Sequence, residues 1–289
     1  MELVQDEPVA ALTPLDQRGV GVIAPYDFAL DRELWEWIPP QVSLHLTRTP
    51  YQRVLVNLTQ AELIGAPEVI ARCAQDLHTI NPEVMAYACT SGSFVGGLAG
   101  EAGIVSALRG GGFDHAVTTS GALLQALDVL DAQVVAVATP YDEPIAARLA
   151  AFLHQAGIAV SGLHSLGLSG RIWTVPYQRT ADLIRRAARA SHTLGRPPQA
   201  VVVSCTNLPT RPLIAPLEAE LGIPVITANQ ATIWAALRTI GLSAVGPGQH
   251  LLTHQPTTPA VPSWPATPAV ASPDTLAVPA PTHAEVRND

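Results

Sequence analysis

Two segments of this chain place a Cys-Thr pair directly after a short apolar run, at 84–90 and again at 200–206. A Pro-Tyr-Asp tripeptide precedes each segment, at 25–27 and at 140–142, so the two markers recur in the same order and at nearly equal spacing. Short apolar runs of this kind are typical of buried parallel strands. The recurrence therefore predicts an internal duplication, in which two similar units are each built from strands that alternate with helices.

The predicted fold class is α/β, with two Rossmann-like units related by a pseudo-twofold axis and with helices flanking the parallel sheet of each unit. The first unit spans 18–131 and contains Cys89, and the second spans 132–248 and contains Cys205. Ligands bind at the carboxyl ends of the strands in such sheets, so we expect the active site in the crevice between the units. Apolar runs predict strands at 19–24, 42–47, 84–88, 116–119, 134–139, 158–163, 200–204 and 224–227.

The two ends of the chain differ from the repeated part. Residues 1–17 are predicted to be a disordered leader. Residues 249–289 are rich in Pro, Ala and Thr and lack helical or strand periodicity, which predicts a disordered tail. Within the units, Ser120 and Asn229 are expected to cap helices that follow strands.

The charge and composition narrow the range of partners. The formal net charge is −8, with 16 Lys and Arg against 24 Asp and Glu, so we expect no nucleic-acid partner. No apolar run approaches the length of a membrane span and no signal-peptide pattern opens the sequence, so we expect no membrane partner. The chain has 3 cysteines, an odd number, which fits reduced thiols in a cytoplasmic protein.

The same reading predicts neither a metal nor a cofactor. The sequence has no Cys-x-x-Cys pair and no closely spaced set of Cys and His. The Gly-rich run at 96–103 follows a Cys turn and enters a helix, which is not the setting of a dinucleotide fingerprint. The expected ligand is a small carboxylate, which backbone donors can hold inside an acidic protein.

Cys89 and Cys205 are the candidate catalytic residues because each follows a strand in one copy of the repeat. A free thiol is mostly protonated at neutral pH, and a position at the start of a helix is expected to lower its pKa. One thiolate and one thiol on opposite faces of a flat substrate can exchange a proton at a carbon beside a carboxylate. They can also add sulfur to an activated double bond. The alternative is that the cysteines are small buried hydrophobic residues, which is the prediction for Cys73.

Candidate substrate-binding residues surround the two thiols in the sequence. The neighbouring Thr90 and Thr206 offer hydroxyl or backbone donors, and Ser91 and Asn207 are candidate donors to an anion. The tyrosine and aspartate of each Pro-Tyr-Asp turn are further candidates, either as ligands or, for the aspartates, as helix N-caps. They are Tyr26, Asp27, Tyr141 and Asp142, of which Tyr141 and Asp27 are predicted to bind substrate.

Three motifs resemble the aspartate/glutamate racemase superfamily, and within it the maleate cis-trans isomerase and arylmalonate decarboxylase group. They are Ala-Cys-Thr-Ser-Gly at 88–92, Thr-Pro-Tyr at 139–141 and Ser-Cys-Thr-Asn at 204–207, and the resemblance covers about 18–248. It implies cofactor-free chemistry beside a carboxylate. By analogy with the isomerases, Cys89 adds to the double bond of maleate, Cys205 delivers a proton, and Tyr141 binds a substrate carboxylate. A homodimer is also implied by the family.

The resemblance leaves other reactions open. Amino-acid racemases of the superfamily use both cysteines as base and acid, whereas the decarboxylases keep only the second. A carboxylate-binding protein without activity is a third possibility. The isomerases have an asparagine shortly after the first strand, and here Asp27 occupies that region, where it would repel a dicarboxylate unless protonated. Arg171 is a candidate source of positive charge in its place.

Overall fold

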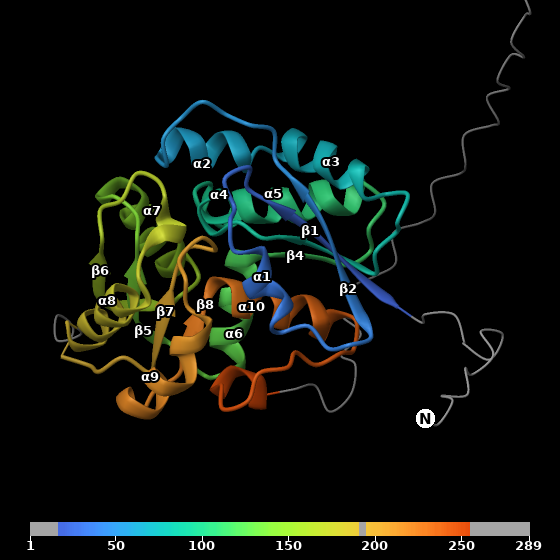
Figure 1. Ribbon diagram of the computed structural model, residues 1–289. Helices are drawn as coiled ribbons and strands as arrows, with labels where there is room; N and C mark the ends of the chain where they lie inside the picture. The colour runs from blue at the N-terminus through green and yellow to red at the C-terminus, as the bar shows by residue number, and fades with distance from the viewer. Residues whose placement is uncertain (1–16, 191–194, 255–289) are drawn as a thin grey trace, which may run out of the picture.

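Two parallel four-stranded sheets, each covered by helices, make up the computed structural model, which describes residues 17–190 and 195–254 (Figure 1). The first sheet has the order β2-β1-β3-β4 and the second has the order β6-β5-β7-β8, so the two sheets share one topology. This result confirms the predicted fold class. The strands are β1 (Arg18–Ala24), β2 (Val42–Arg48), β3 (Val84–Tyr87), β4 (Ala116–Thr118), β5 (Val134–Thr139), β6 (Ala159–Ser165), β7 (Ala200–Val203) and β8 (Val225–Thr227).

The helices alternate with the strands in both repeats. Pro67 begins a helix of its own directly after α2, because proline is tolerated in a first turn but not inside a helix. The helices of the first repeat are α1 (Asp31–Trp35), α2 (Leu58–Ile64), α3 (Pro67–Asp76), α4 (Thr90–Phe94), α5 (Gly97–Gly110) and α6 (Thr119–Val129). Those of the second are α7 (Glu143–Gln155), α8 (Tyr177–Arg189), α9 (Ile214–Leu221) and α10 (Ala228–Thr239), with short 3-10 turns η2 (Ile172–Thr174), η4 (Arg211–Leu213) and η5 (His250–Thr253).

The caps of α6 and α10 lie earlier than predicted. Thr118 caps α6, since its Oγ1 accepts a hydrogen bond of 2.9 Å from the N–H of Gly121, and Ser120 lies inside the helix. Thr227 is the residue before α10, and Asn229 also lies inside its helix. In both cases the last residue of the strand is itself the cap, so strand and helix follow each other with no intervening loop.

The two repeats are joined by helix packing rather than by a continuous sheet. Helix α6 of the first repeat packs against α10 of the second, and both lie at the centre of Figure 1. Trp37 is fully buried and donates from Nε1 to Oε1 of Gln249 at 2.9 Å. Gln249 also accepts a hydrogen bond of 2.8 Å from the Gln230 side chain on α10.

Residues 249–254 correct one sequence expectation. The composition predicts disorder from residue 249 onward, but 250–253 form η5, in which Leu251 is fully buried. Proline-rich composition begins only after this turn, which is why the sequence boundary was placed too early. The remainder of the predicted tail, 255–289, and the predicted leader up to residue 16 lie outside the described residues.

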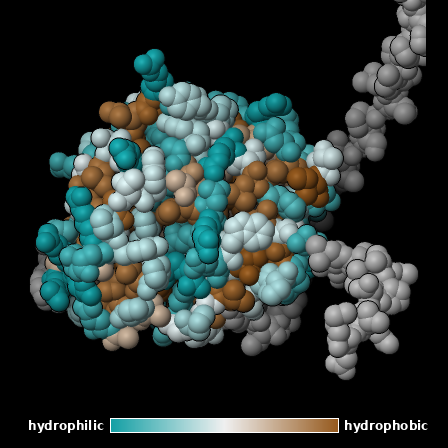
Figure 2. Space-filling view, viewed as in Figure 1, coloured by the Kyte–Doolittle hydropathy of each residue, from teal (hydrophilic) through white to brown (hydrophobic). Residues whose placement is uncertain are grey.

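The outer surface is mixed in character. On the face seen in Figure 2, hydrophobic residues lie in separate patches among hydrophilic ones. The most exposed large hydrophobic side chains include Tyr51 and Leu55, in the segment between β2 and α2. Among the helices of the described ranges, none combines the length and the apolar character needed to cross a membrane.

Candidate active site

A small cavity lies where the two inner strands of each sheet end. It encloses about 20 Å³ of free space, which is room for about one water molecule. A substrate therefore requires movement of lining side chains or loops. All eight residues predicted to form the site line this cavity, namely Asp27, Cys89, Thr90, Ser91, Tyr141, Cys205, Thr206 and Asn207. The carboxyl ends of β1, β3, β5 and β7 thus meet at one place, as expected for parallel sheets.

Cys89 directly precedes α4 and has relaxed, extended backbone, with φ −142° and ψ 116°. Its sulfur accepts a hydrogen bond of 3.4 Å from the N–H of Gly92 and lies 3.8 Å from the hydroxyl oxygen of Ser91. Burial nevertheless raises the pKa of the Cys89 thiol to about 11, although the Gly92 N–H and the hydroxyls of Tyr87 and Ser91 favour the thiolate. The expected lowering of this pKa is therefore wrong, because desolvation outweighs the helix start.

The backbone below the Cys89 thiol is packed without room for another side chain. The fully buried hydroxyl of Tyr87 donates to the carbonyl oxygen of Ile64 at 2.8 Å. A methyl group added to Gly92 would collide with that hydroxyl, and one added to Gly65 would collide with the Gly92 carbonyl. Gly65, Tyr87 and Gly92 therefore fix the position of the thiol, and this role of Tyr87 is not predictable from its place in an apolar strand.

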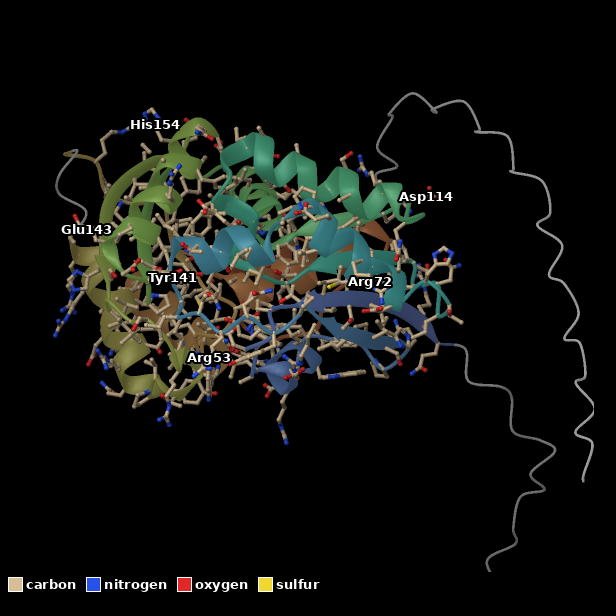
Figure 3. All side chains as sticks on the ribbon, turned by 90° about the horizontal axis from the view of Figure 1, so that it is seen from above. Arg53, Arg72, Asp114, Tyr141, Glu143 and His154 are labelled. Atoms are coloured by element: carbon tan, nitrogen blue, oxygen red, sulfur yellow. The ribbon has the colours of Figure 1, made fainter. Side chains whose placement is uncertain are left out.

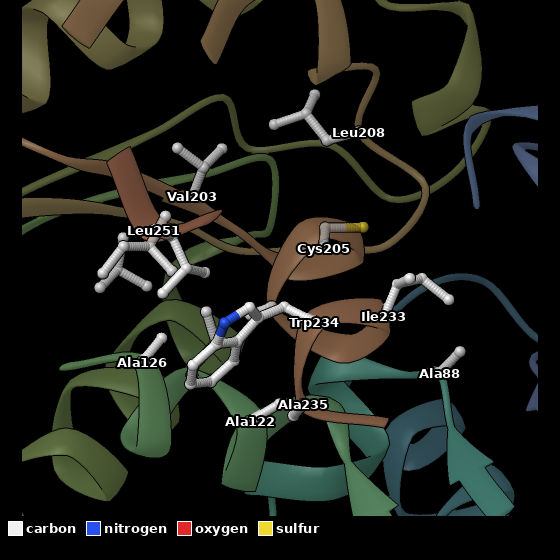
Figure 4. Close-up of a cluster of buried hydrophobic side chains, with 14 of the residues drawn as sticks. Ala88, Ala122, Ala126, Val203, Cys205, Leu208, Ile233, Trp234, Ala235 and Leu251 are labelled. Atoms are coloured by element: carbon white, nitrogen blue, oxygen red, sulfur yellow. The ribbon is translucent and has the colours of Figure 1, made fainter. Parts of the chain in front are cut away.

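Cys205 has a different backbone, with φ at +94°, which is unusual for a residue with a side chain. Its N–H donates to Oγ1 of Thr90 at 3.3 Å, a contact between the two repeats, and its carbonyl accepts from the N–H of Leu208 at 3.1 Å. Figure 4 shows Cys205 among buried side chains that include Leu208 and Ile233. Burial raises the pKa of the Cys205 thiol to about 12.

Tyr141 is buried and points into the molecule, whereas Glu143 and His154 of α7 lie at its outside (Figure 3). Its ring packs edge-on against Phe94, with ring centroids 6.1 Å apart. Burial, and next the thiols of Cys205 and Cys89, raise the pKa of Tyr141 well above its ordinary value. The phenol is therefore protonated at neutral pH and is a hydrogen-bond donor inside the cavity.

Asn207 and Asp27, two further predicted ligands, both take part in other interactions. Asn207 lines the cavity, but its amide oxygen accepts from the N–H of Ala29 at 2.9 Å and its amide nitrogen donates to the Asp27 carbonyl at 3.0 Å. It thus joins the two repeats. Burial raises the pKa of the Asp27 carboxyl, and the Asp27 charge in turn raises the pKa of both catalytic candidates, Cys89 and Cys205.

Two other candidates, Asp142 and Arg171, are not among the residues that line the cavity. Asp142 caps α7, since its Oδ1 accepts a hydrogen bond of 3.2 Å from the N–H of Ile145. Arg171 is exposed and does not line the cavity, whereas its neighbour Ile172 does. No cationic side chain is among the described residues that line the cavity.

Five lining residues were not identified from the sequence. They are Pro25, Val56, Gln60, Ile64 and Ile172. Val56 lies in the segment between β2 and α2, and its N–H donates to the Ser169 carbonyl of the second repeat at 3.0 Å. Gln60 is held by a hydrogen bond of 2.9 Å from its amide to the Tyr26 hydroxyl. The lining therefore includes apolar side chains beside the hydroxyl, amide and thiol groups.

Among the described residues, no three His, Cys, Asp or Glu side chains are grouped so that they could hold a metal ion. The chemistry that these lining residues offer comes from two thiols, one carboxyl group and a set of hydroxyl and amide donors.

Comparison with known proteins decides the family. The model of the arylmalonate decarboxylase family matches residues 54–253. The chain belongs to the arylmalonate decarboxylase family. Its relatives include a maleate isomerase of Nocardia farcinica, 32% identical over 64% of this chain and 74% of the relative, and the arylmalonate decarboxylase of Bordetella bronchiseptica, 32% identical over 60% and 72%. The family is thus one of enzymes, and both named reactions occur among relatives of equal identity.

Solved structures agree with this assignment. A liganded double mutant of arylmalonate decarboxylase aligns with a TM-score of 0.74 at 26% identity, over 82% of this chain and 99% of that one. A Nocardia farcinica maleate cis-trans isomerase aligns with a TM-score of 0.70 at 28% identity, over 81% and 98%. The latter is a cysteine-to-serine mutant with a covalently bound succinylcysteine intermediate.

Proposed function

We propose that this member of the family catalyses cofactor-independent cis–trans isomerisation of a small unsaturated dicarboxylate of the maleate type. The observation that supports this choice is the presence of two thiols, one from each repeat, in the lining of a single cavity. Addition and elimination at a double bond need a nucleophile and a proton donor, and the two cysteines supply both. The succinylcysteine intermediate reported for the Nocardia enzyme is the species that such an addition forms.

In this reaction Cys89 is the nucleophile. Its proton leaves to the Asp27 carboxylate, and Sγ forms a bond to one alkene carbon while the π electrons move to the carbon beside the other carboxylate. The Gly92 N–H and the Ser91 hydroxyl stabilise the thiolate before it attacks, and the Tyr87 hydroxyl does so when its proton turns from the Ile64 carbonyl to the sulfur. Asp27 becomes neutral in this step, so it no longer repels the substrate carboxylate.

Cys205 is the acid in the same step. Its thiol gives a proton to the carbanionic carbon, which leaves a succinyl thioether on Cys89. Rotation about the new single bond exchanges the carboxylate positions. The Cys205 thiolate then removes a proton from that carbon, the C–S bond breaks, and Asp27 returns its proton to Cys89. The Tyr141 phenol, which is protonated at neutral pH, donates to a substrate carboxylate throughout the reaction.

The test is conversion of maleate to fumarate, followed by proton NMR with reduced enzyme and with a chelator present. Fumarate is expected to accumulate at a rate that depends on enzyme concentration. Absence of turnover, while titration shows reduced thiols, would contradict the proposal.

One observation favours racemisation of an amino acid as the second candidate. Asp27 is a carboxyl group inside a cavity without cationic side chains among its described lining residues, and an α-ammonium group would pair with it. In that case the enzyme would exchange the α-hydrogen of the substrate with deuterium from solvent. Such exchange, without conversion of maleate, would favour the racemase.

A further inference from the structure

Glu33 of α1 is a buried carboxylate whose hydrogen-bond donors all come from the second repeat. Its Oε1 accepts from the N–H and the hydroxyl of Thr210, at 2.9 and 3.0 Å, and from the N–H of Arg211. Its Oε2 accepts from the side-chain amide of Asn229 at 3.2 Å. Glu33 is 7% exposed, and within the described ranges it forms no salt bridge, because the Arg211 guanidinium pairs with Glu36 instead.

A buried charge without an ionic partner is costly, so its hydrogen bonds must compensate. Those bonds hold both ends of the turn that carries Cys205. Thr210 and Arg211 follow the turn, and Asn229 extends the contact to its beginning, since the same amide nitrogen donates to the Thr206 carbonyl at 2.9 Å. Glu33 is therefore linked to the residue next to Cys205 through one side chain.

The Cys205 backbone needs such support. A non-glycine residue at φ +94° persists only where its surroundings hold it in place. The local bonds of Cys205 are a 3.3 Å contact from its N–H to Thr90 and a 3.1 Å contact to its carbonyl from Leu208. Further bonds hold the rest of the turn to segment 27–33 of the first repeat, through Asn207 and Glu33.

We propose that Glu33 is a positioning residue, which holds the Cys205 turn against the first repeat so that the Cys205 thiol faces Cys89. The negative charge of Glu33 is needed as well as the shape of its side chain. A glutamine at position 33 has only one acceptor oxygen, so it keeps either the Thr210 and Arg211 donors or the Asn229 donor. Asn229 can turn its unpartnered Oδ1 toward the new amide, but it then loses the Thr206 carbonyl.

The test measures the rate at which iodoacetamide alkylates each cysteine, resolved by peptide mass. It needs no substrate, so its outcome is independent of whether maleate is turned over; only the consequence for turnover depends on the proposed function. In Glu33→Gln and in Asn229→Ala, alkylation of Cys205 is expected to rise by about tenfold or more, the factor that corresponds to losing a hydrogen bond to a charged group. The double variant should show no further increase, because both changes break one chain of contacts.

Two references make the result decisive. Cys73 is buried in the first repeat and reports unfolding of the whole chain, and its rate should stay unchanged. Glu36→Gln is the matched control, since it removes the exposed ion pair with Arg211 beside Glu33 but leaves the Glu33 bonds intact. If maleate is a substrate, Glu33→Gln should lower kcat with little change in KM. Unchanged Cys205 alkylation in both variants would overturn the proposal, and so would an equal rise for Cys73 and Cys205.

Discussion

Cys89 and Cys205 follow the equivalent strands β3 and β7 of the two repeats, yet the chain holds them in different ways. The Cys89 backbone is relaxed, and groups within its own repeat surround the sulfur, namely Gly92, Tyr87 and Ser91. The Cys205 backbone is strained, and its turn depends on bonds from the other repeat. Duplication thus produced two similar thiols, each with groups of its own repeat that favour the thiolate, but held by a relaxed backbone at Cys89 and by a strained one at Cys205.

Replacement of either cysteine by serine tests this division of roles with the largest expected effect. In the proposed reaction Cys89→Ser removes the nucleophile and Cys205→Ser removes the proton donor, so each is expected to lower the rate of maleate turnover by about 1000-fold or more. Steady-state rates measured by NMR check this. Cys73→Ser is the control and should retain activity, because that residue does not line the cavity. Activity that survives the loss of Cys205 would show that the roles are not divided between the two thiols.

Gly92→Ala changes only the environment of Cys89. The added methyl group collides with the Tyr87 hydroxyl and lies 3.2 Å from the Cys89 sulfur, so the thiol must move. A displacement of about 1 Å costs on the order of 100-fold in rate. Gly100→Ala is the matched control, since nothing lies within 4 Å of a methyl group there. It should retain full activity and gain about 0.5–1 kcal/mol of stability from better helix propensity. Equal activity of both variants would argue against a fixed thiol position.

Tyr87→Phe and Tyr141→Phe each remove one hydroxyl group and so test the surroundings of Cys89 and of Cys205 separately. The Tyr87 hydroxyl lowers the pKa of Cys89 and the Tyr141 hydroxyl lowers the pKa of Cys205, so each change should slow alkylation of its own cysteine by about tenfold at fixed pH. Tyr87→Phe also leaves the Ile64 carbonyl unpaired, at a cost of about 1–3 kcal/mol in unfolding free energy. Slower alkylation of both cysteines in either variant would contradict separate environments.

Much of the fold and of the candidate site was predictable from the sequence, for physical reasons. Short apolar runs and the repeated Cys-Thr and Pro-Tyr-Asp markers indicated the strands, the duplication and the eight residues that meet at the strand ends. Gln60 and Ile172 were not identified, because their segments reach the cavity only through packing between repeats. The direction of the thiol pKa shifts was also missed, since burial depends on the completed fold. Glu33 gave no signal, because a glutamate in a short helix is usually solvated.

Both thiols are buried, and the stability of the protein at alkaline pH tests this shared property. The expected effect is the smallest of the predicted ones. Burial raises both pKa values from 9.0, to about 11 and about 12, so the folded state keeps protons that the unfolded state loses. The unfolded state binds fewer protons in this range, and the free energy of unfolding therefore falls as pH rises, by up to about 1.4 kcal/mol per thiol and pH unit. Denaturant unfolding at roughly pH 9 and 10 should show a shallower fall in Cys89→Ser and in Cys205→Ser than in the unmodified chain. An equally steep fall in both variants would mean that the thiols are not desolvated.

The most direct test of the two-thiol mechanism is the mass of the Cys205→Ser variant after incubation with maleate. In this variant the carbanionic carbon takes its proton from solvent, and without the Cys205 thiolate that proton is removed again only slowly, so the peptide that contains Cys89 should carry the mass of one maleate, and the peptide that contains Cys73 should not. An unmodified Cys89 peptide, or an adduct on Cys73 alone, would contradict nucleophilic addition by Cys89.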